Sequence, residues 1–359
     1  MRWLSLVVIC AASRALADPA PVAGDAGVPE APVSHMADPK TPLESLTDDP
    51  ILGKSPRING DEVHGLVAFT FDDGPNPETT PSVIEALEKY DIPATFFIVT
   101  QRLLGKHGAA PRDILTHELA DGFMVGSHSV SHKLLKTANA DLVAKEMDAS
   151  FRTLAKEADR PIGLFRPPYG ALSGTGRARL KKLGVTEVIW SIDTLDWKAH
   201  DADKLRKKVL KMILHDNGGV VLMHDVKPIT AKIIASVLDD LEAENCKRLD
   251  AKDPKQPPIW PVSLHYFLRD DKNSSRPVPA NITKRTDAYK AAFAKRCADR
   301  PKSTAGDLGP PDEGKPKGDF DNSRCIGHPG TEGCTAKPHS KWGDFGADCL
   351  ANPLAKGCS

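Results

Sequence analysis

The sequence predicts an α/β fold built around a mainly parallel sheet. Short apolar runs bounded by turn residues alternate with longer amphipathic segments, the pattern of successive strand–helix units. Seven such runs fall within about two hundred residues, a density that favours a barrel over an open sheet, although periodicity alone leaves both open. The predicted strands are residues 66–71, 94–99, 123–126, 162–165, 186–191, 219–223 and 262–267.

Apolar stripes at helical spacing predict the helices between these strands. In residues 141–158 the positions of Met147, Phe151 and Leu154 fall on one face, and residues 230–244 carry a similar stripe. Together these patterns predict helices over residues 81–90, 141–158, 202–215 and 230–244.

The segment before the predicted domain has the features of an exported protein. Residues 1–17 combine a short basic start, an apolar stretch and the cleavage pattern Ala15-Leu16-Ala17, which is typical of a secretory signal peptide. Lipoprotein processing at Cys10 is a weaker alternative, because the preceding Ile9 is not small. Residues 18–57 are rich in Pro and Ala without periodicity, so we expect a disordered linker. The predicted location is the periplasm, the cell envelope or the exterior.

Charge and hydropathy argue against binding to nucleic acid and against a transmembrane anchor. The formal net charge is zero, with 48 basic and 48 acidic residues, so nothing favours bulk attraction to nucleic acid. No segment after the signal peptide is long and apolar enough to predict a transmembrane anchor.

The cysteines predict disulfides. Of seven cysteines, one falls in the signal peptide, and an even number in the exported part favours disulfide bonds. Cys246 follows the last predicted barrel helix, and Cys297 follows a short helix predicted over residues 286–296. We therefore expect a bridge that ties the polar extension, residues 269–310, to the barrel, although the sequence cannot prove the pairing.

The C-terminal tail, residues 311–359, holds a tandem C-x3-P-x3-G-C repeat. The identical spacing predicts one bridge within each unit, Cys325–Cys334 and Cys349–Cys358. A metal site that uses His328 is the alternative. We expect the tail to attach the protein to the envelope or to a partner.

Two adjacent carboxylates, Asp72 and Asp73, follow the first predicted strand. Ligands of α/β folds bind at the carboxyl ends of parallel strands. Neighbouring strand residues point to opposite sides, so one carboxylate could hold a metal and the other could handle a proton. The alternative is an ordinary acidic turn before Gly74 and Pro75.

The ends of four further strands also carry reactive side chains. His128 and His132 are spaced i, i+4 on one face of a helical turn, so both can reach one ion. With one Asp they make a set of ligands that leaves a position open for water, as catalytic zinc sites require. Arg166 lies in a loop stiffened by two prolines and can pair with a carboxylate, unless it is a surface arginine in a rigid turn. The remaining strand ends carry Asp193 and His224.

Taken in order, these motifs resemble those of the NodB-homology polysaccharide deacetylases, the carbohydrate esterases of family four. The matching motifs are residues 70–75, 128–132, 166–169, 193–197 and 222–224, within a domain of residues 58–268. The resemblance implies an α/β fold that is a distorted (β/α) barrel of seven or eight strands.

The resemblance also implies a metal centre and a base. Asp73, His128 and His132 would hold a divalent metal, with Zn²⁺ expected first and Co²⁺, Ni²⁺ or Mn²⁺ as alternatives. Asp72 would be the general base that activates a water on the metal. Arg166 would pair with Asp72, which relieves the repulsion between the two carboxylates and keeps Asp72 ionised.

An acid and a substrate pocket are implied in the same way. His224 would be the general acid that protonates the leaving amine, oriented by Asp193, with Asp196 as the alternative partner. Further residues would bind the substrate, the first through its backbone N–H at the oxyanion and the others at the acetyl pocket or its rim: Tyr169, Trp197 and Leu222.

The expected activity is metal-dependent deacetylation of N-acetylhexosamine residues in a polysaccharide such as peptidoglycan or chitin. The expected partner is therefore an acetylated polysaccharide. An O-acetyl esterase that acts on xylan or another acetylated glycan is the first alternative. A non-catalytic glycan-binding envelope protein is the second, and it is disfavoured because a binder needs no complete set of base, metal ligands and acid.

Overall fold

The structure, a computed structural model, describes residue 36, residues 38–271 and residues 273–300 of the chain. The strands among these residues are β1 (Leu66–Asp72), β2 (Ala94–Ile98), β3 (Met124–Ser127), β4 (Leu164–Phe165), β5 (Thr186–Glu187), β6 (Ile192–Asp193), β7 (Gly218–His224) and β8 (Trp260–Pro261). The predicted signal peptide, the first part of the predicted linker and the cysteine-containing tail lie outside the described residues.

Helices connect these strands along the chain. The α-helices are α1 (Leu43–Thr47), α2 (Thr80–Tyr90), α3 (Ala109–Ala120), α4 (Ala140–Val143), α5 (Ala149–Ala158), α6 (Gly174–Leu183), α7 (Ala202–His215), α8 (Pro228–Ala251) and α9 (Ala280–Asp299). Shorter helical turns are η2 (Thr100–Leu103), η3 (Ala144–Asp148), η4 (Pro168–Gly170), η5 (Asp196–Lys198) and η6 (Leu264–Phe267), of which η3 is a π-helix and the others are 3₁₀ helices.

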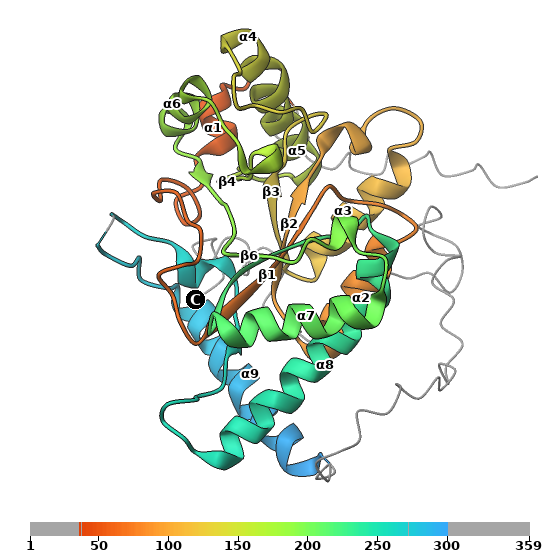
Figure 1. The fold of residues 1–359 in the computed structure, drawn as a ribbon. Helices are drawn as coiled ribbons and strands as arrows, with labels where there is room; N and C mark the ends of the chain where they lie inside the picture. The colour runs from red at the N-terminus through yellow and green to blue at the C-terminus, as the bar shows by residue number, and fades with distance from the viewer. Residues whose placement is uncertain (1–35, 37, 272, 301–359) are drawn as a thin grey trace, which may run out of the picture. The chain divides into compact units, whose positions relative to one another are not determined.

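The strands form a single parallel sheet in which β1 takes a central place (Figure 1). The order is β5-β4-β3-β2-β1-β7-β6, and the pairings between neighbours are parallel. β8 pairs with Leu66 and Val67 of β1. Since β7 pairs along the whole of β1, β8 takes the other edge, before the point where β2 begins to pair at Phe69. The alternation of strands and helices confirms the predicted α/β fold.

The sheet curls because the segment of residues 186–193 bonds to β4 on one side and to β7 on the other. The N–H of Val188 donates to Phe165 O of β4 at 2.9 Å, and the N–H of Ser191 donates to Val220 O of β7 at 3.1 Å. The single strand predicted over residues 186–191 is therefore divided between β5 and β6, because the chain changes neighbours there. The result is a curled, incompletely closed barrel, in agreement with the predicted distorted barrel.

The two sides of β1 have different surroundings. Val67, Phe69 and Phe71 belong to the large core between the sheet and its helices. Ala68 belongs to a second cluster on the side away from the helices. Because side chains alternate along a strand, the side of Ala68 is also the side of Thr70 and Asp72. The first reactive carboxylate thus enters the inner face of the curled sheet.

The helices pack as neighbours in the order of their strands. α2, α8 and α7 lie side by side, and α9 contacts α8 (Figure 1). α2 has a proline in its first turn, and it ends at Asp91, whose φ is 62°. Both ends of this helix are therefore determined by local sequence. Asp201 caps α7 by accepting a hydrogen bond from Lys204 N. None of the helices in the described ranges is long and apolar enough to cross a membrane.

The linker prediction over residues 18–57 was wrong for its last part. α1 falls within it and lies against α5 and α6. Leu43 and Leu46 of this helix are 4% and 1% exposed and belong to the large core. Thr47 Oγ1 donates to Leu183 O at 3.0 Å. A helix this short has too few residues to show periodicity, so the packed unit begins well before residue 58.

The strand predicted over residues 262–267 was also wrong. The N–H of Val262 still donates to Val67 O at 2.9 Å, but the chain then turns away into η6. Further pairing is blocked because β2 takes the same edge of β1 from Phe69 onward. The strand therefore lies earlier, as β8.

The described part of the predicted polar extension, which ends at residue 300, belongs to the packed unit. Its helix α9 is longer than the predicted range of 286–296 and buries Phe293 completely, with its ring 5.3 Å from that of Trp260. A disulfide joins Cys246 of α8 to Cys297 of α9, which confirms that predicted bridge. The tail bridges Cys325–Cys334 and Cys349–Cys358 lie outside the described residues.

Candidate active site

Asp72 ends β1 with its carboxylate held by a buried arginine. Arg166 Nη1 donates to Asp72 Oδ1 at 2.7 Å and to Thr70 Oγ1 at 2.8 Å. Asp72 is 2% exposed, and Arg166 is fully buried with its guanidinium 4.1 Å from the centroid of the Phe97 ring. The predicted pairing of Arg166 with Asp72 is present, and the alternative of a surface arginine is excluded.

The environment of Asp72 favours a carboxylate that can exchange a proton. Burial raises the pKa of Asp72, while the charge of Arg166 opposes that rise by favouring the ionised form. The arginine is fixed in place because its Nε and Nη2 donate to Val188 O and Ile189 O, each at 3.3 Å. The second oxygen of Asp72, Oδ2, lies 3.6 Å from His128 Nε2.

A carboxylate and two imidazoles converge beside this pair. Asp73 Oδ1 lies 3.6 Å from His128 Nε2 and 3.4 Å from His132 Nε2. One ligand atom from each residue lies within 4.8 Å of the others. The structure therefore brings together the three predicted metal ligands.

These three residues fit a divalent cation. Asp73 Oδ1 is buried and has no hydrogen-bond partner among the described residues, which is costly for a carboxylate oxygen unless it binds a cation. His128 Nδ1 lies 2.7 Å from Arg166 O, so this nitrogen carries the proton and Nε2 presents its lone pair. Burial lowers the pKa of His128 to about 3, which keeps the ring neutral, as a ligand must be.

The histidines meet by a different route from the predicted helical turn. Residues 128–132 are not helical, and both Ser129 and His132 have positive φ, 68° and 58°. Asp73 also has positive φ, 77°. These residues with left-handed backbone reverse the direction of the loops and bring the two histidines together. The prediction that both histidines lie near one site is confirmed, but the helical turn on which it was based is wrong.

Sequence reasoning missed Glu146, which holds the histidine loop in place. Its Oε2 accepts from Ser131 N at 2.8 Å, and its Oε1 accepts from Ser131 Oγ at 2.6 Å. Val130 N donates to the backbone oxygen of Glu146 at 3.0 Å. Glu146 is 3% exposed and lies in the π-helical turn η3, a feature often found at functional sites. An acidic residue on the apolar stripe of the helix was the available signal.

His224 is paired with Asp196, which corrects the preferred assignment to Asp193. Asp196 Oδ1 accepts from His224 Nδ1 at 2.7 Å, and its Oδ2 accepts from His224 N at 2.7 Å and from Thr230 Oγ1 at 2.6 Å. Asp193 Oδ1 instead accepts from Leu195 N at 3.0 Å. The physical reason is the left-handed turn at Leu195, φ 56°, which presents the later carboxylate to the histidine.

Asp196 favours the protonated form of His224. Burial acts to lower the pKa of His224, but the hydrogen bond and charge of Asp196, with the nearby charges of Asp72 and Asp73, raise it to about 9. His224 pairs directly with Asp72 across the β1–β7 ladder, so both lie on the same side of the sheet. A protonated imidazole thus lies on the same side of the sheet as the Asp72 carboxylate.

The predicted substrate-binding residues surround these groups. Tyr169 is 65% exposed, has φ 59° and sets its ring 4.7 Å from that of His132. Trp197 is 54% exposed and follows Asp196 in η5. Leu222 is 4% exposed and pairs with Thr70, on the side of the sheet that carries Asp72. Their roles at an acetyl group stay predictions.

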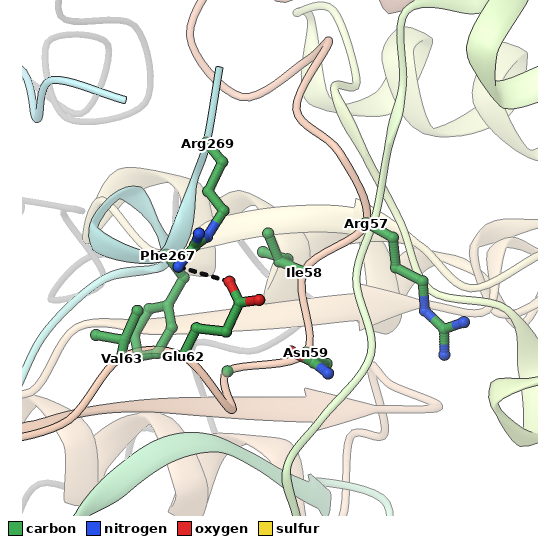
Figure 2. Close-up of a pocket in the computed structure, with 8 residues that line it drawn as sticks. Arg57, Ile58, Asn59, Glu62, Val63, Phe267 and Arg269 are labelled. Atoms are coloured by element: carbon green, nitrogen blue, oxygen red, sulfur yellow. Dashed lines mark ion pairs between the residues drawn. The ribbon is translucent and has the colours of Figure 1, made fainter. Parts of the chain in front are cut away.

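A separate pocket of about 300 Å³ contains none of these residues (Figure 2). An ion pair of 2.6 Å between Arg269 and Glu62 lies along its wall. The lining residues are Arg57, Ile58, Asn59, Gly60, Glu62, Val63, Phe267 and Arg269. Asp72, His224 and the group of Asp73, His128 and His132 instead define the candidate active site at the carboxyl ends of the strands.

Known proteins resemble this chain over the part that carries most of these residues. A family model described as polysaccharide deacetylase matches residues 59–188. A chitooligosaccharide deacetylase of Bradyrhizobium sp. (strain ANU 289) is 32% identical over 175 residues, which cover 48% of this chain and 77% of that protein. The peptidoglycan-N-acetylglucosamine deacetylase PgdA of Listeria monocytogenes is 31% identical over 191 residues, which cover 53% of this chain and 39% of that protein. The chain therefore spans well under half of the length of this second relative.

A solved structure of the Bc1960 peptidoglycan N-acetylglucosamine deacetylase aligns with a TM-score of 0.47 and 27% identity, covering 53% of this chain and 88% of that one. The curled α/β sheet carries at its strand ends an Asp-His-His group that could hold a metal ion. The chain belongs to the polysaccharide deacetylase family.

Proposed function

We propose that the protein removes acetyl groups from N-acetylhexosamine residues of a polysaccharide. The observation that carries this proposal is the convergence of three separately tuned sets of groups at one end of the sheet. They are the Asp72–Arg166 pair, the Asp73–His128–His132 cluster and the His224–Asp196 pair. Amide hydrolysis needs a base, stabilisation of an oxyanion and an acid, and these sets can supply all of them.

The cluster of Asp73, His128 and His132 would hold a divalent ion, and we propose Zn²⁺ because imidazole and carboxylate ligands suit it. When bound there, such an ion supplies Lewis acidity, which lowers the pKa of a water molecule and polarises a carbonyl oxygen. The donor set also suits Co²⁺, Ni²⁺ and Mn²⁺, so the ion has to be determined by metal analysis.

Asp72 would take the proton from the attacking water at Oδ2. Its other oxygen is occupied by Arg166 Nη1, which leaves Oδ2 on the side of His128. Burial raises the pKa of Asp72 toward neutral pH. A general base works best when its pKa lies near the pH of the reaction.

His224 would give a proton to the departing amine from Nε2. Nδ1 is bonded to Asp196, so the proton available for transfer is the one on Nε2. A pKa of about 9 keeps that proton in place at neutral pH. We further propose that the backbone N–H of Tyr169 donates to the oxyanion and that Trp197 and Leu222 contact the acetyl group.

The substrate class rests on the relatives and on export. The chitooligosaccharide and peptidoglycan deacetylases named above suggest an N-acetylglucosamine polymer. The sequence of residues 1–17 supports export through a signal peptide, which would place the enzyme with envelope or external polymers. We propose that the tail, residues 311–359, attaches the protein to the envelope.

Acetate release tests this proposal. We expect release from N-acetylglucosamine oligomers or peptidoglycan, loss of release after treatment with a chelator and recovery on addition of Zn²⁺. Release from acetyl-xylan alone would identify an O-acetyl esterase. No release from any of these substrates would indicate a glycan-binding protein and contradict the proposal.

A further inference from the structure

A second cluster of metal-ligating side chains lies away from the site described above. Glu88 is in the last turn of α2, His117 is in the last turn of α3, and Asp121 is the residue at which α3 ends. One ligand atom from each lies within 4.8 Å of the others. The Asp73–His128–His132 centre is the other such group of His, Cys, Asp and Glu among the described residues.

The contacts within this second cluster leave one carboxylate oxygen unsatisfied. His117 Nε2 lies 3.2 Å from Glu88 Oε1 and 2.8 Å from Asp121 Oδ2. Only the contact with Glu88 has the geometry of a hydrogen bond, and Asp121 Oδ2 is buried without a hydrogen-bond partner. Asp121 as a whole is 5% exposed. Two carboxylates thus face a single imidazole nitrogen, which can direct one hydrogen or one lone pair.

The electrostatic surroundings call for positive charge. The C-terminal ends of α2 and α3 meet here, and each end carries the partial negative charge of its helix dipole. Burial raises the pKa of Glu88, and the neighbouring Asp121 raises it further. The adjacent carboxylates of Asp121 and Glu88 raise the pKa of His117 to about 10 against the effect of burial. Without a metal, a proton on His117 supplies the missing charge.

The position of the cluster separates it from the catalytic chemistry. β1 ends at the candidate active site, α2 then runs back, and Glu88 comes shortly before β2 begins at Ala94. The same holds for α3, whose last turn precedes β3. The cluster therefore lies at the amino ends of the strands, opposite the catalytic residues.

We propose that Glu88, His117 and Asp121 form a second divalent-cation site that joins the C-terminal ends of α2 and α3. One imidazole nitrogen and two carboxylate oxygens are a borderline donor set, which suits Zn²⁺, and solvent can complete the coordination because His117 is half exposed. Bound there, the cation satisfies Asp121 Oδ2, replaces the proton on His117 and bridges two helices that otherwise meet through side chains alone. The site is structural, so it does not depend on the proposed activity.

The test is zinc stoichiometry in the full exported chain, stripped with a chelator and titrated with Zn²⁺. Calorimetry and elemental analysis would be compared for the wild type, His117→Gln and Glu88→Gln. We expect each variant to bind one equivalent fewer than the wild type and to release acetate at the wild-type rate. His215→Gln is the matched control, because His215 is exposed and contacts a single carboxylate, that of Asp216 at 2.7 Å.

A thermal readout strengthens the test. Cation binding to the folded state alone raises stability by about 2.7 kcal/mol when free zinc is about a hundred times its Kd. The wild type should therefore gain a further rise in melting temperature that both variants lack. Equal stoichiometry in the wild type and in Glu88→Gln would overturn the proposal and leave His117 as a protonated bridge. Glu88→Gln carries this comparison even if His117→Gln folds poorly.

Discussion

Within the part of the chain that the structure describes, two groups of three histidine and carboxylate side chains could each hold a metal ion, and their surroundings differ. At the strand ends, Asp73, His128 and His132 sit on loops with positive φ, and burial lowers the pKa of His128 to about 3. At the helix ends, Glu88 and Asp121 flank His117, whose pKa rises to about 10. One cluster holds a neutral histidine and the other a charged one.

The difference lies in the charge that surrounds each cluster. At the strand ends, Arg166 neutralises Asp72, so a single carboxylate, Asp73, remains for two imidazoles. At the helix ends, His117 itself lies between the two carboxylates and balances their charge. An imidazole must be neutral to bind a cation, whereas a protonated imidazole can itself balance two carboxylates.

The largest expected effect separates the two clusters by substitution of one carboxylate in each. Asp73→Asn should lower deacetylase activity on the order of 10³-fold, because several kcal/mol of electrostatic stabilisation depend on the ion. Asp121→Asn should leave the rate unchanged. Steady-state acetate release and bound zinc, measured in parallel, check both. An active Asp73→Asn variant would show that this carboxylate does not hold the ion.

The next effect separates Asp72 from its neighbour. Asp72→Asn removes the base but keeps the three ligands, so we expect turnover to fall about 10²–10⁴-fold with zinc content retained. The measurement is kcat beside metal analysis of the same sample. If Asp72→Asn and Asp73→Asn lose zinc equally, the two carboxylates do not divide their roles as we propose.

The buried arginine should matter for stability more than an arginine on a helix surface. Arg166→Met leaves Asp72 buried without its counter-ion, and such a loss costs about 3–5 kcal/mol. Arg206→Met is the matched control, since Arg206 pairs with Asp240 between α7 and α8 at 2.5 Å but stays partly exposed. That pair should contribute about 1 kcal/mol or less. Chemical unfolding measures both, and equal losses would contradict the comparison.

The smallest effect concerns pH. His224 is protonated below its raised pKa of about 9, so activity should decline as the pH rises through that value. The same shift contributes folding stability that is complete below about pH 6.5 and is lost as the pH rises through about 9. Asp196→Asn removes the main cause of the shift and should move the alkaline limb of kcat toward lower pH.

The control for this profile is Asp193→Asn, because Asp193 bonds to Leu195 N and not to His224. An alkaline limb that moves with Asp193→Asn and stays fixed with Asp196→Asn would restore the original assignment. Rates between pH 6 and pH 10 would decide between the two carboxylates.

The sequence predicted the elements whose pattern is continuous. The strand β1 and the helices α7 and α8 lie where they were expected, because burial on a parallel sheet produces a continuous apolar pattern. The pairing of Cys246 with Cys297 was also predicted from position.

What the sequence could not provide depends on contacts that are distant in the chain. α1 is too short for periodicity and is stable only against α5 and α6. The turn at Leu195 determines whether Asp193 or Asp196 reaches His224. The spacing of three residues between the two carboxylates does not predict this turn. The change of partner between β5 and β6 likewise reflects neighbours from β4 and β7.

The pairing of β1 with β7 has a consequence for how the protein folds. Leu66 of β1 pairs with Gly218, about 150 residues later, and contacts this distant in sequence form slowly. Until the later strand arrives, the central strand has one edge open to incorrect partners. Asp72 and His224 are joined across that same ladder. Catalytic competence is therefore a late event in folding, and activity should report that the sheet is complete.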